Sequence, residues 1–307
     1  MKEDQRPSSN HQRKPIITKV FTYPTVYIIL LVLSYSLGYL SQSLSAPTTQ
    51  QSPQLPAPSV FQFSNLPTQL DNFRVTTHCG ETLPAQLVSQ TILDRVFNGI
   101  SPYTNFPPPD ATSLLKPKRI KGWGSYATVF RNLIQRVKPR VIIEVGTFLG
   151  ASALHMANLT RTLGLQTQII CVDDFRGWPG FRDRFKDIGM INGNVLLLYQ
   201  FMQNVVSSDA TGSVLPLPFS TASGLQKLCE WGVAADLIEI DAGHDFISAW
   251  GDINRAYRIL RPGGVIFGHD YFTAVDNRGV RRAVNLFAQM NNFNISTDGQ
   301  HWVINTT

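Results

Sequence analysis

The sequence predicts an α/β fold built on an open, mostly parallel sheet. The first observation is the apolar run Val141–Val145, whose β-branched residues are typical of a fully buried strand. The second is the glycine turn directly after this run, formed by Gly146 and Gly150 and leading into the helix-like segment Ala151–Thr162. The third is that later apolar runs also alternate with helical spacing, as crossover connections between parallel strands require.

Charge is distributed unevenly along the 307 residues, which carry a net charge of +6. Basic residues crowd the first nineteen positions, and no charged side chain then occurs between Lys19 and Asp71. Within that gap, residues 20–44 are long and apolar enough for a membrane helix, which needs ~20 residues. A cleaved signal peptide is the alternative, although its apolar core is usually only ~7–15 residues long.

The next segment, residues 45–71, is rich in Pro, Gln, Ser and Thr and predicts an extended stem. Because basic flanks stay cytoplasmic, we expect a cytosolic tail (1–19), a single-pass type II anchor (20–44) and a lumenal domain (72–307). This plan is similar to that of Golgi-resident transferases. The expected location is therefore the endomembrane system, at the Golgi membrane.

N-glycosylation sequons and cysteines also bear on the expected lumenal location of residues 72–307. Three N-glycosylation sequons fit a lumenal glycoprotein, and they begin at Asn158, Asn294 and Asn305. Of the three cysteines, Cys171 lies in an apolar strand and is expected to be a buried small side chain. Cys79 and Cys229 could pair in an oxidising compartment, but sequence alone does not fix the pairing.

The remaining elements are predicted from periodicity. Helical spacing predicts helices over 83–100, 196–206 and 221–231, and an amphipathic helix that begins at Phe246. Apolar runs predict strands over 166–172, 214–219, 237–240 and 265–267, and a final hairpin over 292–296 and 301–305. The loop 175–194 interleaves aromatic and basic residues, which is consistent with a lid over substrate or with surface packing.

Acidic residues occur directly after three of the predicted strands. Asp173 and Asp174 come after the second strand, Asp241 after the strand 237–240, and His269-Asp270 after the strand 265–267. In open α/β sheets, ligands bind outside the carboxyl ends of the strands. Asp241 and Asp270 are expected to end neighbouring strands, ~4.8 Å apart. Two carboxylates at that spacing suit Mg²⁺ or another divalent cation.

Two stretches resemble a known family. The pattern Glu144-x-Gly146-x-x-x-Gly150 resembles the first motif of class I S-adenosylmethionine-dependent methyltransferases. The fuller pattern Glu-Val-Gly-Thr-Phe-x-Gly-x-Ser-Ala is similar to macrocin-type O-methyltransferases and to proteins labelled cephalosporin hydroxylase. The run Ile-Asp-Ala-x-His … Leu-Arg-Pro-Gly-Gly-Val … Gly-His-Asp-Tyr, between Ile240 and Tyr271, resembles the same subgroup. A dinucleotide fingerprint is disfavoured because its middle glycine is absent.

The resemblance implies a Rossmann-like, seven-stranded, mostly parallel sheet with an antiparallel last strand. It also implies S-adenosylmethionine as cofactor, with Asp173 accepting hydrogen bonds from both ribose hydroxyls and Asp174 as the alternative. The cofactor-binding residues that it implies are Glu144, Gly146, Thr147, Gly150, Ser152 and Asp173.

The reaction implied by the resemblance is methyl transfer to a hydroxyl of a sugar or secondary metabolite. A divalent cation on Asp241 and Asp270 would lower the pKa of that hydroxyl, and His244 or His269 would take its proton. Asp241 could instead orient the substrate without metal.

The expected partners are a small-molecule or glycan acceptor and the membrane, with no nucleic acid. Two alternatives remain: a non-catalytic scaffold that binds the cofactor, and a hydroxylase in which His244, His269 and Asp241 bind a redox metal.

Overall fold

The computed structural model describes residues 32–34, 36 and 78–306 of the chain. The chain divides into two units, residues 1–72 and residues 73–307, and every element named below belongs to the second. The predicted tail (1–19), the stem (45–71) and most of the anchor (20–44) lie outside the described residues. Within the part that is described, none of the helices has the length and apolar character that a membrane crossing needs.

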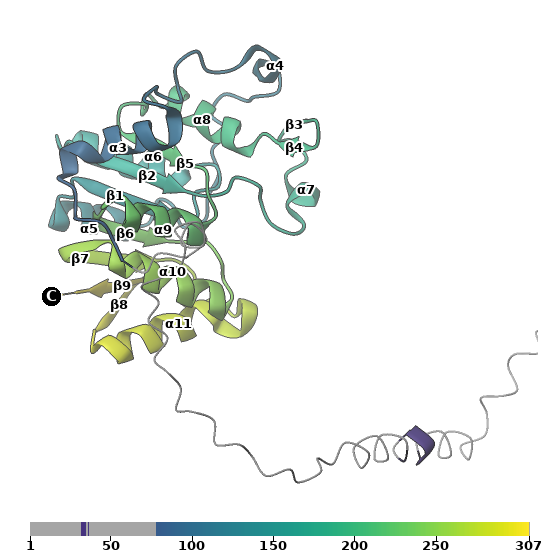
Figure 1. Ribbon diagram of the computed structural model, residues 1–307, viewed down its shortest axis with the longest axis vertical. Helices are drawn as coiled ribbons and strands as arrows, with labels where there is room; N and C mark the ends of the chain where they lie inside the picture. Colours follow the sequence, from purple (N-terminus) through teal and green to yellow (C-terminus); the bar gives the residue numbers. More distant parts are fainter. Residues whose placement is uncertain (1–31, 35, 37–77, 307) are drawn as a thin grey trace, which may run out of the picture. The chain divides into compact units, whose positions relative to one another are not determined.

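A seven-stranded sheet forms the centre of the second unit (Figure 1). In spatial order its strands are β5 (Val214–Leu217), β2 (Gln168–Val172), β1 (Val141–Val145), β6 (Ala235–Ile240), β7 (Leu260–Gly268), β9 (His301–Asn305) and β8 (Ile295–Asp298). The first five are parallel to one another, whereas β9 is antiparallel to both β7 and β8. The predicted Rossmann-like sheet, with its antiparallel last strand, is confirmed.

Helices supply the residues that bury both faces of the sheet. One buried cluster contains Ile143 of β1 and residues of α3 (Ala85–Phe97), α9 (Thr221–Glu230), α10 (Phe246–Arg258) and α11 (Val275–Asn291). The other contains Ile142 and residues of α5 (Thr128–Val137), α6 (Ala151–Thr162) and α8 (Leu197–Ser207). Neighbouring residues of β1 therefore enter opposite layers, which explains why all five of its side chains are apolar or fully enclosed.

Short elements fill the connections. They are α4 (Pro109–Thr112), α7 (Phe181–Arg184), β3 (Met190–Ile191) and β4 (Asn194–Val195). The last three belong to the long connection between β2 and α8, where the sequence predicted a lid or surface packing. Figure 1 shows this connection projecting from the body of the unit.

The strand β7 differs from its prediction. It begins at Leu260 rather than Val265, so the sequence Arg261-Pro-Gly-Gly264 is an irregular strand entry and not a stop between elements. The register between β6 and β7 shifts between Ala235 and Leu237. This bulge accommodates a proline and two glycines that a regular ladder would not.

A disulfide joins Cys79 to Cys229, a pairing that the sequence left open. It ties the segment before α3 to the end of α9. Cys171 is buried and free, as predicted.

Candidate active site

Strand register brings several chain segments to one edge of the sheet. Val145, the last residue of β1, lies opposite Val172 of β2 and Ile240 of β6. Ile240 in turn lies opposite Gly268 of β7. The residues directly after these four positions therefore lie side by side, and we call this the carboxyl edge.

The glycine turn after β1 depends on both of its glycines. Gly146 and Gly150 both have positive φ values, +89° and +81°. A Cβ on Gly146 would lie 2.3 Å from the carbonyl oxygen of Asp241, and one on Gly150 would lie 2.8 Å from the Phe201 ring. Close packing of the chain against itself therefore requires both glycines, before any ligand approaches.

The Glu144 carboxylate binds this turn to the following helix. It is fully buried, and it accepts hydrogen bonds from Thr147 Oγ1, at 2.6 Å, and from Ser152 Oγ. These contacts satisfy a charge that would otherwise be costly in the core. Three predicted cofactor-binding residues thus contact one another, and their contact with the cofactor stays a prediction.

Two buried carboxyls should make stability depend on pH. Burial raises the pKa of Glu144 from 4.5 to about 7, against hydrogen bonds from Ser152 and Thr147 that lower it. Burial also raises the pKa of Glu239, its neighbour across β1 and β6. Between the unfolded and folded pKa values, the folded state holds more protons, so stability falls as pH rises.

We therefore expect the unfolding free energy to fall between pH 4.5 and about 7, by up to about 1.4 kcal/mol per pH unit for each carboxyl. Urea unfolding at several pH values measures this slope. Glu144→Gln should flatten it, and adding Glu239→Gln should flatten it further. A slope that is unchanged in both variants would show that these carboxyls do not cause it.

Asp173 lies at the end of β2, as predicted, and holds the glycine turn. Its Oδ2 accepts the backbone amides of Thr147 (3.0 Å) and Phe148 (2.8 Å), and its Oδ1 accepts that of Phe175 (2.7 Å). Since a carboxylate oxygen has two lone pairs, Oδ1 keeps one acceptor position. Asp173 therefore has room for one ribose hydroxyl, whereas the prediction gave it two.

A compact cluster of four polar side chains lies just beyond β6 and β7. His244 Nε2 lies 3.1 Å from Asp270 Oδ2, and His269 Nδ1 lies 3.2 Å from the same oxygen. His269 Nδ1 is also 3.9 Å from Asp241 Oδ1. The structure thus brings together all the predicted catalytic and metal-binding residues. Their roles stay predictions.

The protonation of the cluster is set by these contacts. Burial acts to raise the pKa of Asp270, but the adjacent imidazoles of His244 and His269 outweigh it and hold this pKa well below its usual range. Burial raises the pKa of Asp241 to about 6, with opposition from His269. The Asp270 contact raises the pKa of His244. Asp270 therefore favours its ionised form, which attracts protons or a cation to its neighbours.

The cluster fits a divalent cation. Asp241, His269 and Asp270 each offer a ligand atom, and these atoms lie within 4.8 Å of one another. His269 Nδ1 is buried and makes no aligned hydrogen bond, despite its nearness to two carboxylates. An unsatisfied nitrogen facing two anionic oxygens suits a metal better than it suits an internal hydrogen-bond network. The set contains two carboxylates and one imidazole.

Sequence reasoning missed three neighbours of the cluster. The ring of His301 on β9 lies 4.7 Å from that of His269, and burial lowers the pKa of His301 to about 4. A Cβ on Gly124 would lie 2.6 Å from His269 Nε2. Trp302 lines the hollow beside the cluster. The predicted hairpin already contained His301, but only antiparallel pairing of β9 with β7 shows which residue it approaches.

A flap lies over the glycine turn. We use this name for residues 176–195, which contain α7, β3 and β4. Phe148 of the turn contacts both Trp178 and Phe185 of the flap, with ring centroids 5.3 Å and 5.0 Å apart. Trp123, from the segment before α5, stacks on Phe148 at 5.6 Å. Aromatic side chains from three segments therefore enclose the turn.

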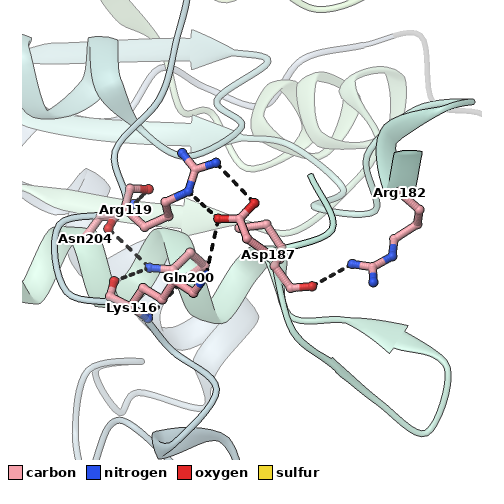
Figure 2. Close-up of polar contacts among 7 residues, drawn as sticks. Lys116, Arg119, Arg182, Asp187, Gln200 and Asn204 are labelled. Carbon is pink, nitrogen blue, oxygen red and sulfur yellow. Dashed lines mark hydrogen bonds and ion pairs between the residues drawn. The ribbon is translucent and has the colours of Figure 1, made fainter. Parts of the chain in front are cut away.

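Two ion pairs to Asp187 attach the flap to the segment before α5, one from Arg119 and one from Lys116, whose Nζ lies 3.6 Å from Asp187 Oδ2 (Figure 2). Arg119 donates to both carboxylate oxygens of Asp187, at 2.6 Å and 3.3 Å. From α8, Asn204 donates to the carbonyl oxygen of Arg119, and Gln200 bonds both backbone polar groups of Lys116. Bonds from α8 thus hold the segment that carries Arg119, and Asp187 is the flap residue with which this segment forms its ion pairs.

The hollow beside the cluster is small. It is lined by Asp241, His244, His269 and Asp270 among others, and its volume is about 10 Å³, which is room for about one water molecule. A groove of about 980 Å³ lies elsewhere, against residues such as Arg140, Gln168 and Ser213, at the amino ends of the strands. The larger groove therefore lies at the opposite end of the strands from Asp241, His244, His269 and Asp270.

The segment that carries this geometry matches a known family. Residues 143–271 match a family described as "Methyltransferase domain". The matched segment begins in β1 and ends just after Asp270, so it contains the glycine turn, Asp173 and the whole cluster. No curated protein matches the chain in sequence.

Solved structures to which this chain is similar include O-methyltransferases. One is from Bacillus cereus, in complex with SAH, with 17% identity, coverage of 71% of this chain and 96% of that chain, and a TM-score of 0.43. Another is TomG from Streptomyces achromogenes, involved in tomaymycin synthesis and in complex with SAM, with 13% identity, coverage of 78% and 96%, and a TM-score of 0.42. The family match and the sheet topology support a class I S-adenosylmethionine-dependent methyltransferase.

Proposed function

We propose that this protein transfers a methyl group from S-adenosylmethionine to a hydroxyl of a small-molecule or glycan acceptor. The observation that carries the proposal is the cluster of Asp241, His244, His269 and Asp270, which lies beside the glycine turn within the matched segment. Ligands of open α/β sheets bind at this edge.

The residues fit the cofactor. Asp173 keeps one acceptor position on Oδ1 for a ribose hydroxyl, and it is partly exposed. Glu144 acts indirectly, because its hydrogen bonds fix Thr147 and Ser152 and hence the turn. When bound, S-adenosylmethionine supplies an electrophilic methyl group. The flap that encloses the turn would keep water out once it closes over the ligand.

The cluster accounts for activation of the acceptor. Asp241, His269 and Asp270 would hold a divalent cation, which lowers the pKa of a hydroxyl bound to it. His244 is the most exposed of the four side chains, at 41%. Since its Nε2 faces Asp270, its Nδ1 is the nitrogen free to take the hydroxyl proton. His269 is 11% exposed and enclosed by Gly124, so it suits the role of a ligand.

Calorimetric titration of the purified protein with S-adenosylmethionine tests the cofactor assignment. We expect binding by the wild type, and at least about tenfold weaker binding by Asp173→Asn, because one charge-assisted hydrogen bond is worth about 1.5–3 kcal/mol. Asp94→Asn, on the exposed face of α3, is the matched control and should bind normally. A wild-type protein without affinity for S-adenosylmethionine would overturn the proposal.

We further propose that residues 72–307 face the lumen of the Golgi, held by a type II anchor at residues 20–44. The apolar segment with its basic flank supports this orientation. The Cys79–Cys229 disulfide supports an oxidising compartment. Protease treatment of sealed Golgi vesicles should leave this domain intact until detergent is added, and cleavage without detergent would contradict the orientation.

A further inference from the structure

An aromatic and cationic surface lies at the mouth of the candidate site. Trp123 and Trp178 are 42% and 38% exposed, which is unusual for side chains of this size. Their ring centroids are 6.2 Å apart. Lys121 and Arg184 border them, and we call these four residues the tryptophan platform.

The two cations of the platform are held by an indole ring. Lys121 Nζ lies 5.6 Å from the centroid of Trp123, and Arg184 Cζ lies 5.9 Å from it. Among the described residues, no carboxylate lies within ion-pair distance of either cation. Arg119, on the same segment, is instead neutralised by Asp187. Two positive charges are thus held against one indole ring and left available to an external anion.

The platform adjoins both parts of the candidate site. Trp123 stacks on Phe148, whose backbone amide is bound by Asp173. The residue after Trp123 is Gly124, which packs against His269 Nε2 of the cluster. A molecule on the platform would therefore lie next to the predicted cofactor turn and the predicted metal ligands at once.

We propose that the tryptophan platform binds a uronic acid residue of an acidic glycan, and that this sugar is the methyl acceptor. A ring hydroxyl oxygen would form the bond to the methyl carbon as the carbon–sulfur bond of S-adenosylmethionine breaks, S-adenosylhomocysteine would leave, and the hydroxyl proton would pass to His244 Nδ1. The inference rests on the proposed function. A uronic acid offers what the surface requires: an apolar ring face for an indole, a carboxylate for Lys121 and Arg184, and ring hydroxyls for methylation. A neutral sugar would leave both cations unpaired. An anionic lipid would supply charge but no ring for the exposed indole.

The test uses the purified full-length protein and three probes. A short oligomer of galacturonic acid should change the tryptophan fluorescence on binding, and a galactose oligomer of equal length should bind at least about tenfold more weakly, because the charge-assisted contacts are lost. Vesicles that contain phosphatidylserine test a lipid surface as the alternative ligand. Equal binding of the acidic and neutral oligomers, or binding of the vesicles alone, would overturn the proposal.

Two double variants test whether the acidic oligomer binds at the tryptophan platform. The double variant Lys121→Gln, Arg184→Gln should bind the acidic oligomer at least about tenfold more weakly. The matched control Lys118→Gln, Lys186→Gln removes two exposed charges nearby in sequence and should bind normally. If both double variants lost binding of the acidic oligomer, or if neither did, the assignment of this binding to the tryptophan platform would be wrong.

Calorimetry with S-adenosylmethionine on the same wild-type sample separates this inference from the proposed function. If the protein binds S-adenosylmethionine but not the acidic oligomer, the glycan acceptor is refuted and the proposed methyl transfer is not. Oligomer binding without cofactor binding supports the platform as a sugar site and refutes methyl transfer.

Discussion

Replacement of Asp270 by asparagine should strongly weaken binding of a divalent cation and, with it, methyl transfer. Asp270 Oδ2 is the oxygen that both imidazoles approach, at 3.1 Å and 3.2 Å. The substitution removes the anion that keeps the cluster attractive to a cation. We expect the affinity for Mn²⁺ to fall about a hundredfold or more, measured by calorimetry in the absence of any acceptor.

Two controls make the Asp270→Asn result specific. Asp209→Asn changes a fully exposed carboxylate just after α8 and should leave Mn²⁺ affinity unchanged. S-adenosylmethionine affinity of the Asp270→Asn protein should also be retained, because Asp270 does not contact the glycine turn. If Asp270→Asn bound Mn²⁺ like the wild type, the metal set of Asp241, His269 and Asp270 would be wrong.

Gly146→Ala should destabilise the fold more than Gly164→Ala, a substitution at a glycine of similar backbone geometry. A Cβ at this position would lie 2.3 Å from the carbonyl oxygen of Asp241 and 2.7 Å from Ala242 Cα, and neither backbone atom can move aside cheaply. Backbone strain at φ +89° adds to this collision. We expect a loss of about 3 kcal/mol or more in unfolding free energy.

Gly164→Ala is the matched control for Gly146→Ala. Gly164 also has a positive φ, +68°, but a Cβ there would meet nothing within 4 Å. Backbone strain alone should then lower the unfolding free energy of Gly164→Ala by about 1 kcal/mol. Urea unfolding of both variants separates collision from strain, and equal losses would mean that Gly146 is required only for its backbone conformation.

The fold was predictable because its strongest patterns are local. The β-branched run Val141–Val145 forms β1 with the predicted bounds, and Ala151–Thr162 forms α6 with the predicted bounds. Each is flanked by glycine, which defines where it starts or ends. The entry to β7 at Arg261-Pro-Gly-Gly264 was not predictable, because a bulge against β6 overrides the usual effect of proline and glycine.

The candidate site was predictable to the extent that strand ends define it. Asp241, His269 and Asp270 come directly after parallel neighbouring strands, and parallel register alone brings them together. Contacts between distant segments were beyond such reasoning. Neither the closure of the flap through Asp187 nor the packing of Gly124 on His269 leaves a periodic pattern in the sequence.

A crystal structure of the protein with S-adenosylhomocysteine tests the placement of the cofactor most directly. We predict that the flap moves, that a ribose hydroxyl lies within hydrogen-bond distance of Asp173 Oδ1, and that the sulfur faces Asp241 and Asp270. A nucleoside bound instead in the groove of about 980 Å³ at the amino ends of the strands would contradict this placement.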